Sequence, residues 1–197
     1  MSRWLFGGLL IALIYLKWPE ARVTLEAGIM APALPQQTTI KDPVAFAVEH
    51  YVITPLAEFE ITAKVLSRER YRFDKEADLS PIDFALGWQR MSDEAVLQHF
   101  SVKQGHRWFH WQADQLPIPQ AEIAASAANM HLIPADDFIR AQLLAVKQGS
   151  IVTLEGQLVE VRDTQEQWHW RSSLTRNDTG AGACEIIWVK QVTLLDH

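Results

Sequence analysis

The chain has 197 residues, of which 48% are hydrophobic and 21% are charged, a balance that is ordinary for a globular protein and excludes wholesale disorder. Its length suits one well-buried core and leaves little room for a second full domain. The formal net charge of −6 disfavours binding to nucleic acid, because an acidic body repels phosphate backbones.

The N-terminal segment contains an uncharged apolar run, WLFGGLLIALIYL at residues 4–16, flanked by Arg3 and Lys17. With its flanking tryptophans this run would extend roughly 22 Å as a helix, against a hydrocarbon core of roughly 30 Å. A cleaved signal peptide and a buried core helix are alternatives, but no small-residue cleavage site follows closely. We therefore predict an uncleaved signal anchor over residues 1–18, with the N-terminus in the cytoplasm and the remainder on the periplasmic side of the inner membrane.

The segment after the anchor predicts an extended connector and then one globular domain. Residues 19–43 contain four prolines, which block helices and allow only short strands near Val23 and Thr39. The globular α+β domain is expected over residues 44–197. Apolar and polar side chains alternate in AEFEITAKVL at residues 57–66, which predicts a half-buried strand.

The middle of the chain carries several helix-start patterns. SPID at residues 80–83 offers a capping serine, a proline suited to the first helical position and an acid three residues later, so a short helix ending at Gly87 is predicted. Further helices are expected over residues 92–100 and 136–149, with a strand at residues 106–111 between them.

The C-terminal residues predict an antiparallel meander. Its strands are expected at residues 151–161, 167–174 and 183–195, with a turn at residues 177–182 before the third. The apolar register slips at Gly156, which predicts a bulge there. Strongly bent strands of this kind occur in small barrels, including OB-like ones, but three strands do not decide between a barrel and an open sheet.

Histidine and cysteine spacing gives no metal centre. His106 and His110 would lie about 13 Å apart on a strand, too far to share one ion. The single cysteine excludes an intrachain disulfide and any site built from several thiolates. We expect no cofactor and no metal. Cys184 enters an apolar strand and is expected to be a buried, inert thiol rather than a nucleophile.

Two aromatic residues near the C-terminus allow two interpretations. Trp168 and Trp170 would share one face of a strand. Such a face can stack on sugar rings or bases, but a tryptophan pair more often belongs to the core because it buries a large apolar area.

Two polar clusters are candidates for catalysis. Asn129 and His131 would share a strand face, where histidine could serve as a base and asparagine could orient a ligand; the alternative is a buried pair that fixes local structure. The polar run at residues 171–178 is either a structured loop or a binding rim, and no serine-hydrolase or phosphate-binding motif accompanies it. Its candidate side chains are Ser172, Ser173, Arg176 and Asp178.

A resemblance adds to this interpretation. The segments at residues 80–97, 126–135 and 172–189 together resemble an uncharacterised family of bacterial proteins with an N-terminal membrane segment. The resemblance implies a bacterial envelope protein, and it brings no activity, cofactor or catalytic residue with it.

These observations lead to two functional hypotheses. The first is a membrane-tethered, non-enzymatic binding or assembly module, inserted through residues 4–18 and partnered with another envelope protein. The alternative is an envelope hydrolase that uses His131 together with the 171–178 run.

Overall fold

The computed structural model describes residues 22–175 and 184–195. They form a mixed α+β domain that is mostly sheet with a few short helices, in agreement with the expected class. The predicted anchor at residues 1–18 lies outside the described residues. Among the residues that are described, none of the helices is both long enough and apolar enough to cross a bilayer.

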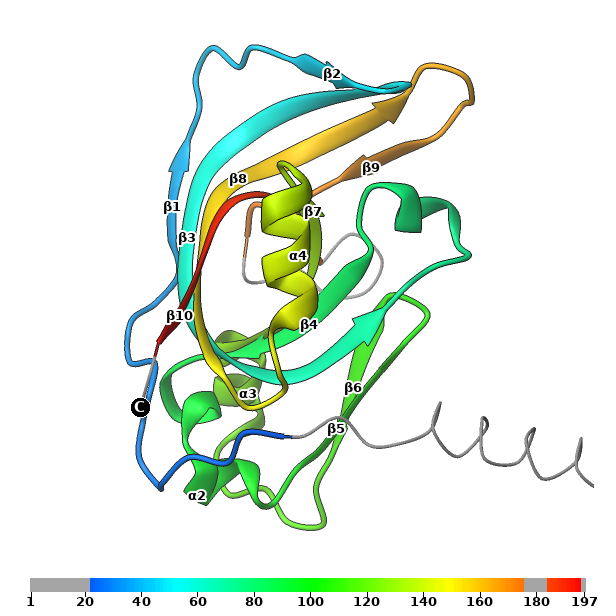
Figure 1. The fold of residues 1–197 in the computed structure, drawn as a ribbon. Helices are drawn as coiled ribbons and strands as arrows, with labels where there is room; N and C mark the ends of the chain where they lie inside the picture. Colours follow the sequence, from blue (N-terminus) through cyan, green and yellow to red (C-terminus); the bar gives the residue numbers. More distant parts are fainter. Residues whose placement is uncertain (1–21, 176–183, 196–197) are drawn as a thin grey trace, which may run out of the picture.

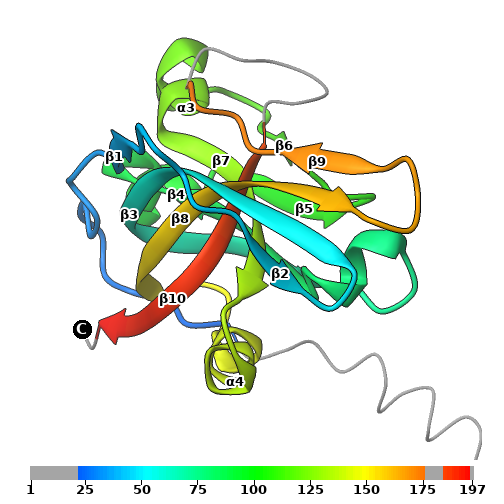
Figure 2. The ribbon, with the colours of Figure 1, turned by 90° about the horizontal axis from the view of Figure 1, so that it is seen from above.

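Five of the described strands close into a ring (Figures 1 and 2). In chain order they are β3 (Tyr51–Arg70), β4 (Ile82–Gly87), β7 (Ala127–Pro134), β8 (Ile151–Asp163) and β10 (Glu185–Leu195). Around the ring the order is β3-β4-β7-β10-β8, and β8 pairs again with β3. If the five are numbered in chain order, the ring order is therefore 1-2-3-5-4-1. The β7–β10 pair is parallel, and the other ring pairs are antiparallel.

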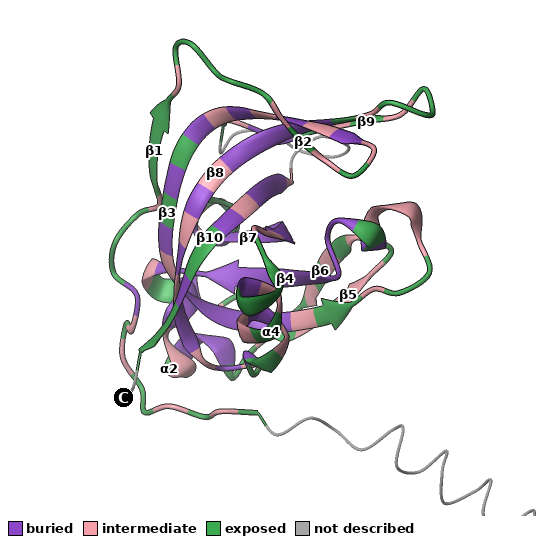
Figure 3. Cartoon of the chain, turned by 45° about the horizontal axis from the view of Figure 1, so that its top comes forward, coloured by how far each residue is buried: buried purple, intermediate pink, exposed green. Residues whose placement is uncertain are grey.

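The main core lies inside the ring. Alternate side chains of each strand point inward, because successive residues of a strand face opposite sides of the sheet. On β4 and β7 the inward residues are Ile82, Phe84, Leu86, Met130 and Leu132, all fully buried. Each contributes roughly 1.5–3 kcal/mol through burial. The intervening residues face outward, yet Figure 3 shows that β4 and β7 are buried along most of their length. Other elements therefore cover their outer faces.

The remaining elements lie around the ring. The further strands are β1 (Gln36–Thr39), β2 (Phe46–Val48), β5 (Ser101–Gly105), β6 (Trp108–Gln112) and β9 (His169–Arg171). The helices are η1 (Lys75–Asp78), η2 (Gln89–Ser92), α2 (Glu94–Leu97), α3 (Gln120–Ser126) and α4 (Asp137–Ala145). β1 and β2 pair with β3, β9 pairs with β8, and β5 and β6 form a separate hairpin. α4 connects β7 to β8 and packs Ile139 and Leu143 against the main core.

The predicted helix over residues 80–87 is wrong, because these residues form strand β4. The helix-start pattern is real, but Ile82, Phe84 and Leu86 also alternate with period two. Burying those three inside the ring outweighs the local capping preference.

The predicted strands at residues 57–66, 106–111 and in the C-terminal part are present. The C-terminal strands do not form a meander, however, because β8 lies between β9 and β10. The predicted irregularity occurs opposite Gly156, where the register shifts between Val189 and Gln191 of β10. Gly156 is required there, since a Cβ atom would lie 2.0 Å from the carbonyl oxygen of Trp188.

Two of the predicted helices are present in shortened form. Asp93 caps α2 by accepting from the backbone N–H of Ala95, and Asp136 caps α4 by accepting from that of Ile139. α4 ends at Ala145, before the predicted end at Gly149.

Candidate functional site

A network of charged groups centres on Asp83, a fully buried carboxylate on the outer face of β4. One of its oxygens accepts from Nη1 of Arg107 at 2.8 Å and from the hydroxyl of Ser80 at 3.3 Å. The other lies 2.8 Å from Nδ1 of His131, on the neighbouring strand β7. The register explains this contact, because Asp83 and His131 are direct partners in the β4–β7 ladder.

Arg107 reaches this network from a strained turn. The β5–β6 hairpin turns through His106 and Arg107, whose φ angles are 53° and 66°. Turns with two positive φ angles prefer Asn-Gly, so two larger side chains here carry a conformational cost. The guanidinium binds both carboxylate oxygens of Asp74, at 2.8 and 2.7 Å, and lies 3.7 Å from the ring centre of Tyr71. The two hydrogen bonds to Asp74 hold the guanidinium of Arg107 in position against Asp83.

Asn129 attaches the same hairpin to β7. Its side-chain N–H donates to the carbonyl of Arg107 at 3.0 Å, and its side-chain oxygen accepts from Gln104 at 2.6 Å. Asn129 is buried. Its amide therefore serves to position the hairpin over the outer face of β7.

The electrostatics favour a charged imidazole at His131. Burial lowers the pKa of His131, but the hydrogen bond to Asp83 and the interaction with the side chain of Cys184 outweigh burial and raise the pKa to about 9. Burial also lowers the pKa of Arg107, and the carboxylates of Asp74 and Asp83 more than compensate, so its pKa is raised. Burial, with a further contribution from Asp83, raises the pKa of Tyr71 to about 12.

A cavity of about 360 Å³ opens beside this network. It is lined by Glu76, Arg107, Trp108, His131, His169, Trp170, Arg171 and Cys184. The indole of Trp170 packs with its ring centre 4.6 Å from that of His131. Trp108 is 38% exposed and lines the cavity. The lining thus combines flat apolar surfaces with groups that donate and accept hydrogen bonds.

The cavity has a defined place on the ring. His131 comes from the outer face of β7, the third ring strand. Glu76 belongs to the connection between the first and second ring strands, and Trp170 and Cys184 belong to the connection between the fourth and fifth. The β5–β6 hairpin supplies Arg107, which lines the cavity together with His169 of β9.

The structure brings together only part of the predicted catalytic set. His131 lines the cavity, whereas Asn129 is committed to the hairpin. Ser172 and Ser173 are buried, and their hydroxyls donate to the carbonyls of Ser173 and Thr175 respectively. The hydroxyl of Ser172 also accepts from the backbone of Ile186. Neither serine lines the cavity. The other two candidates, Arg176 and Asp178, lie outside the described residues.

One expectation about the C-terminal residues is corrected. Cys184 is not buried but partly exposed, and it lines the cavity. Trp168 and Trp170 are partly exposed and pack against a buried core cluster, so they belong to the core in part.

Sequence reasoning assigned Asp83 to a helix start and missed its role in the site, and it did not single out Arg107. Asp83 could have been recognised, because it places a carboxylate on the opposite strand face from Ile82, Phe84 and Leu86. Nothing in the sequence points to Arg107, since its partners are distant in the chain.

Neither of the spaced histidines joins the site. His106 lies in the hairpin turn and His110 on β6, both exposed. Within residues 22–175 and 184–195, no group of three histidine, cysteine, aspartate or glutamate side chains gathers closely enough to hold a metal ion.

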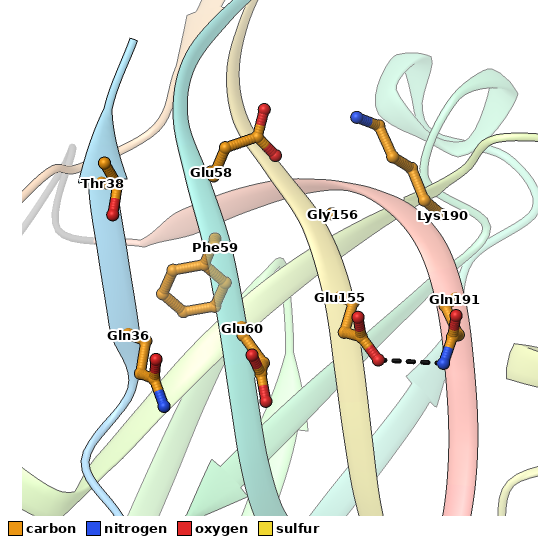
Figure 4. A pocket seen from close by; sticks show the side chains of 9 residues that line it. All are labelled: Gln36, Thr38, Glu58, Phe59, Glu60, Glu155, Gly156, Lys190 and Gln191. Carbon is orange, nitrogen blue, oxygen red and sulfur yellow. Dashed lines mark hydrogen bonds between the residues drawn. The ribbon is translucent and has the colours of Figure 1, made fainter.

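A second cavity, of about 340 Å³, lies across the outer faces of β1, β3, β8 and β10 (Figure 4). Glu58, Glu60 and Glu155 extend over it, with Lys190 at its far side. The side-chain amides of Gln157 and Gln191 donate to Glu58 and Glu155 respectively. These are ordinary contacts of a solvated sheet face, and the buried charges and aromatic walls of the first cavity make it the candidate site.

Comparison with models of protein families, with curated proteins and with solved structures found no match for this chain.

Proposed function

We propose that this protein is a membrane-tethered binding module of the bacterial envelope, built on an OB-like barrel, whose ligand is a saccharide held in the cavity beside His131. The position of the cavity supports this proposal most directly. In OB barrels the strand order is 1-2-3-5-4-1, and ligands bind on the face of strands 2 and 3 between the 1–2 and 4–5 connections. The cavity of this protein lies beside the third ring strand, between the equivalent two connections, and this likeness of architecture supports the proposal.

The chemistry of the lining selects among the ligands that such barrels take, which are oligonucleotides and oligosaccharides. Trp108 and Trp170 offer indole faces on which a sugar ring can stack. Glu76, His169 and Arg171 supply acceptors and donors for hydroxyl groups. The net charge of −6 disfavours a polyanionic strand. A neutral, hydroxyl-rich ligand suits the site best.

The test is a titration of the full-length protein, in detergent, with neutral and amino sugars and their short oligomers. Tryptophan emission and calorimetry report binding. We expect at least one saccharide to bind saturably, and Trp108→Ala to weaken it roughly tenfold, because losing a stacking partner costs on the order of 1–2 kcal/mol. Phe138→Ala is the control, since this exposed aromatic residue lies on α4 outside the cavity. Tighter binding of a single-stranded oligonucleotide, or saccharide binding indifferent to Trp108→Ala, contradicts the proposal.

A hydrolase is the second candidate function, and one observation favours it. His131 is oriented by a buried carboxylate at 2.8 Å, as a catalytic histidine must be held. The serines first considered as nucleophiles are engaged with the backbone. A hydrolase at this site would therefore need another nucleophile.

A further inference from the structure

Cys184 lies at the entrance of the last ring strand and faces the cavity. It precedes β10 by one residue, and its carbonyl accepts from the backbone N–H of Ser173 at 3.1 Å. Ile186 is the partner of His131 in the parallel β7–β10 pair. Because side chains two apart on a strand share a face, Cys184 and His131 lie on the same outer side of the sheet.

The imidazole of His131 stands between a carboxylate and this thiol. Nδ1 is 2.8 Å from a carboxylate oxygen of Asp83, and that oxygen accepts a hydrogen bond from the Nδ1–H group. The ring therefore has Nε2 left for a second partner. Cys184 interacts with the imidazole and lines the same cavity.

We propose that Cys184 is the nucleophile of an acyl-transfer centre, with His131 as its general acid and base and Asp83 as the residue that positions His131. The three side chains come from β4, β7 and the start of β10, which are adjacent in the ring. A nucleophile beside a base that a third group orients is the general arrangement of such centres. This inference goes beyond ligand binding and holds whether or not the ligand is a saccharide.

The substrate class is a carboxylic ester small enough for the cavity. The thiolate of Cys184 attacks the carbonyl carbon, the bond to the leaving alcohol breaks, and the departing oxygen takes the proton from Nε2 of His131. Water then attacks the thioester, gives one proton to Nε2, and releases the carboxylic acid as the carbon–sulfur bond breaks. The sum is ester plus water giving acid plus alcohol, with thiolate and imidazolium restored.

The surroundings suit a thiolate at Cys184 paired with an imidazolium at His131. The titratable and charged groups that face it are Asp83 on β4, Glu76 on η1, Arg107 in the hairpin turn, and His169 and Arg171 on β9. Glu185, which follows Cys184, belongs to the opposite face of β10. Trp170 packs against His131 and limits the access of water to the imidazole. An imidazolium beside a thiol favours the thiolate.

The first experiment uses the full-length protein and p-nitrophenyl acetate. We expect a burst of nitrophenolate close to about one equivalent per chain, followed by slower turnover. Cys184→Ala should abolish the burst, and His131→Gln should slow it by roughly a hundredfold. His110→Gln should keep it, because this exposed histidine on β6 does not belong to the array. A burst that survives in Cys184→Ala overturns the proposal.

The second experiment measures alkylation by iodoacetamide against pH, which is unambiguous because the chain has one cysteine. The alkylation rate of an ordinary thiol rises with pH and reaches half of its maximum at about pH 8.5. We expect the wild-type rate to reach a plateau below about pH 7, because the imidazolium stabilises the thiolate. His131→Gln should return the midpoint to about 8.5, and Asp83→Asn should move it in the same direction, which a merely structural role of Asp83 would not do. The pH profile of the wild-type protein tests the proposal even if a variant fails to fold. A wild-type alkylation midpoint at the ordinary value for a thiol overturns the proposal.

Neither experiment contains a saccharide. Saccharide binding by the Cys184→Ala protein tests the binding module separately. The two proposals can therefore fail independently.

Discussion

At the scale of single residues, the pairing of His131 with Asp83 decides how the site behaves. Both side chains are almost completely buried, and a charged group is tolerated there only when it is paired. Arg107 holds the second carboxylate oxygen, so the loss of one member leaves the others incompletely compensated. Stability and the proposed chemistry therefore depend on the same atoms.

His131→Ala should lower the free energy of unfolding by roughly 1–3 kcal/mol, because it leaves buried polar partners unpaired. Thermal and denaturant melts of the wild-type and variant proteins measure this difference. A variant at least as stable as the wild type would contradict a structural contribution from His131.

Stability should also fall as the pH rises through the neutral range. The pKa of His131 is raised to about 9 in the folded protein, against about 6.5 in an unfolded chain. The stabilisation of the folded state by the His131–Asp83 pair is therefore complete below about pH 6.5 and is lost as the pH approaches 9. It amounts to on the order of 3 kcal/mol. Denaturant melts at several pH values measure the slope. His131→Gln should flatten it, and the exposed His99→Gln should not.

At the scale of elements, the β5–β6 hairpin is held by its turn and by its contacts with β7. The turn places two non-glycine residues at positive φ, and Arg107 offsets that cost with its bonds to Asp74 and Asp83. Asn129 holds the hairpin a second time through the carbonyl of Arg107. His106 is exposed and makes no comparable contribution.

The two turn residues should therefore respond oppositely to glycine. His106→Gly should raise the free energy of unfolding by up to about 1 kcal/mol, because glycine adopts positive φ without strain. Arg107→Gly relieves the same strain but removes two ion pairs to partly or fully buried carboxylates, and it should destabilise by several kcal/mol. Melting curves of the two variants check both signs. A loss of stability in His106→Gly would show that the turn is not strained there.

The elements also show what the sequence could and could not predict. The alternation of apolar and polar residues predicted the strand at residues 57–66, and local helix-start patterns predicted α2 and α4, because these signals are local. Strand β4 was misassigned because a good local helix start competes with burial in the ring, which is a tertiary effect. The candidate site is harder still to predict from the sequence. Cys184 meets His131 only through the parallel β7–β10 pairing, and Arg107 meets Asp83 only through the folded hairpin.

At the scale of the whole molecule, the predicted anchor would determine where the cavity lies relative to the membrane. The ring with its added strands forms one body around one main core, and residue 22, where the described chain begins, is connected to the predicted membrane segment. An anchor would leave the cavity at a limited distance from the bilayer and restrict the ligands that reach it.

The orientation of the anchor can be tested by fusion. Alkaline phosphatase folds to an active form only outside the cytoplasm, so a C-terminal fusion to the full-length chain should be active. The mature protein should also retain its N-terminal residues by mass spectrometry. An inactive fusion would contradict the predicted orientation, and cleavage after the apolar run would contradict the anchor.

The closure of the ring by β10 has a consequence for biosynthesis. β10 follows every other ring strand in the chain, and β3 pairs with β8 across a long separation, with Tyr51 opposite Asp163. A growing chain that lacks β10 leaves the edges of β7 and β8 open, and such edges invite pairing with other chains. Non-local closure of this kind is slow. A chain that lacks β10 therefore exposes two strand edges, and the reactivity proposed for Cys184 requires the closed ring.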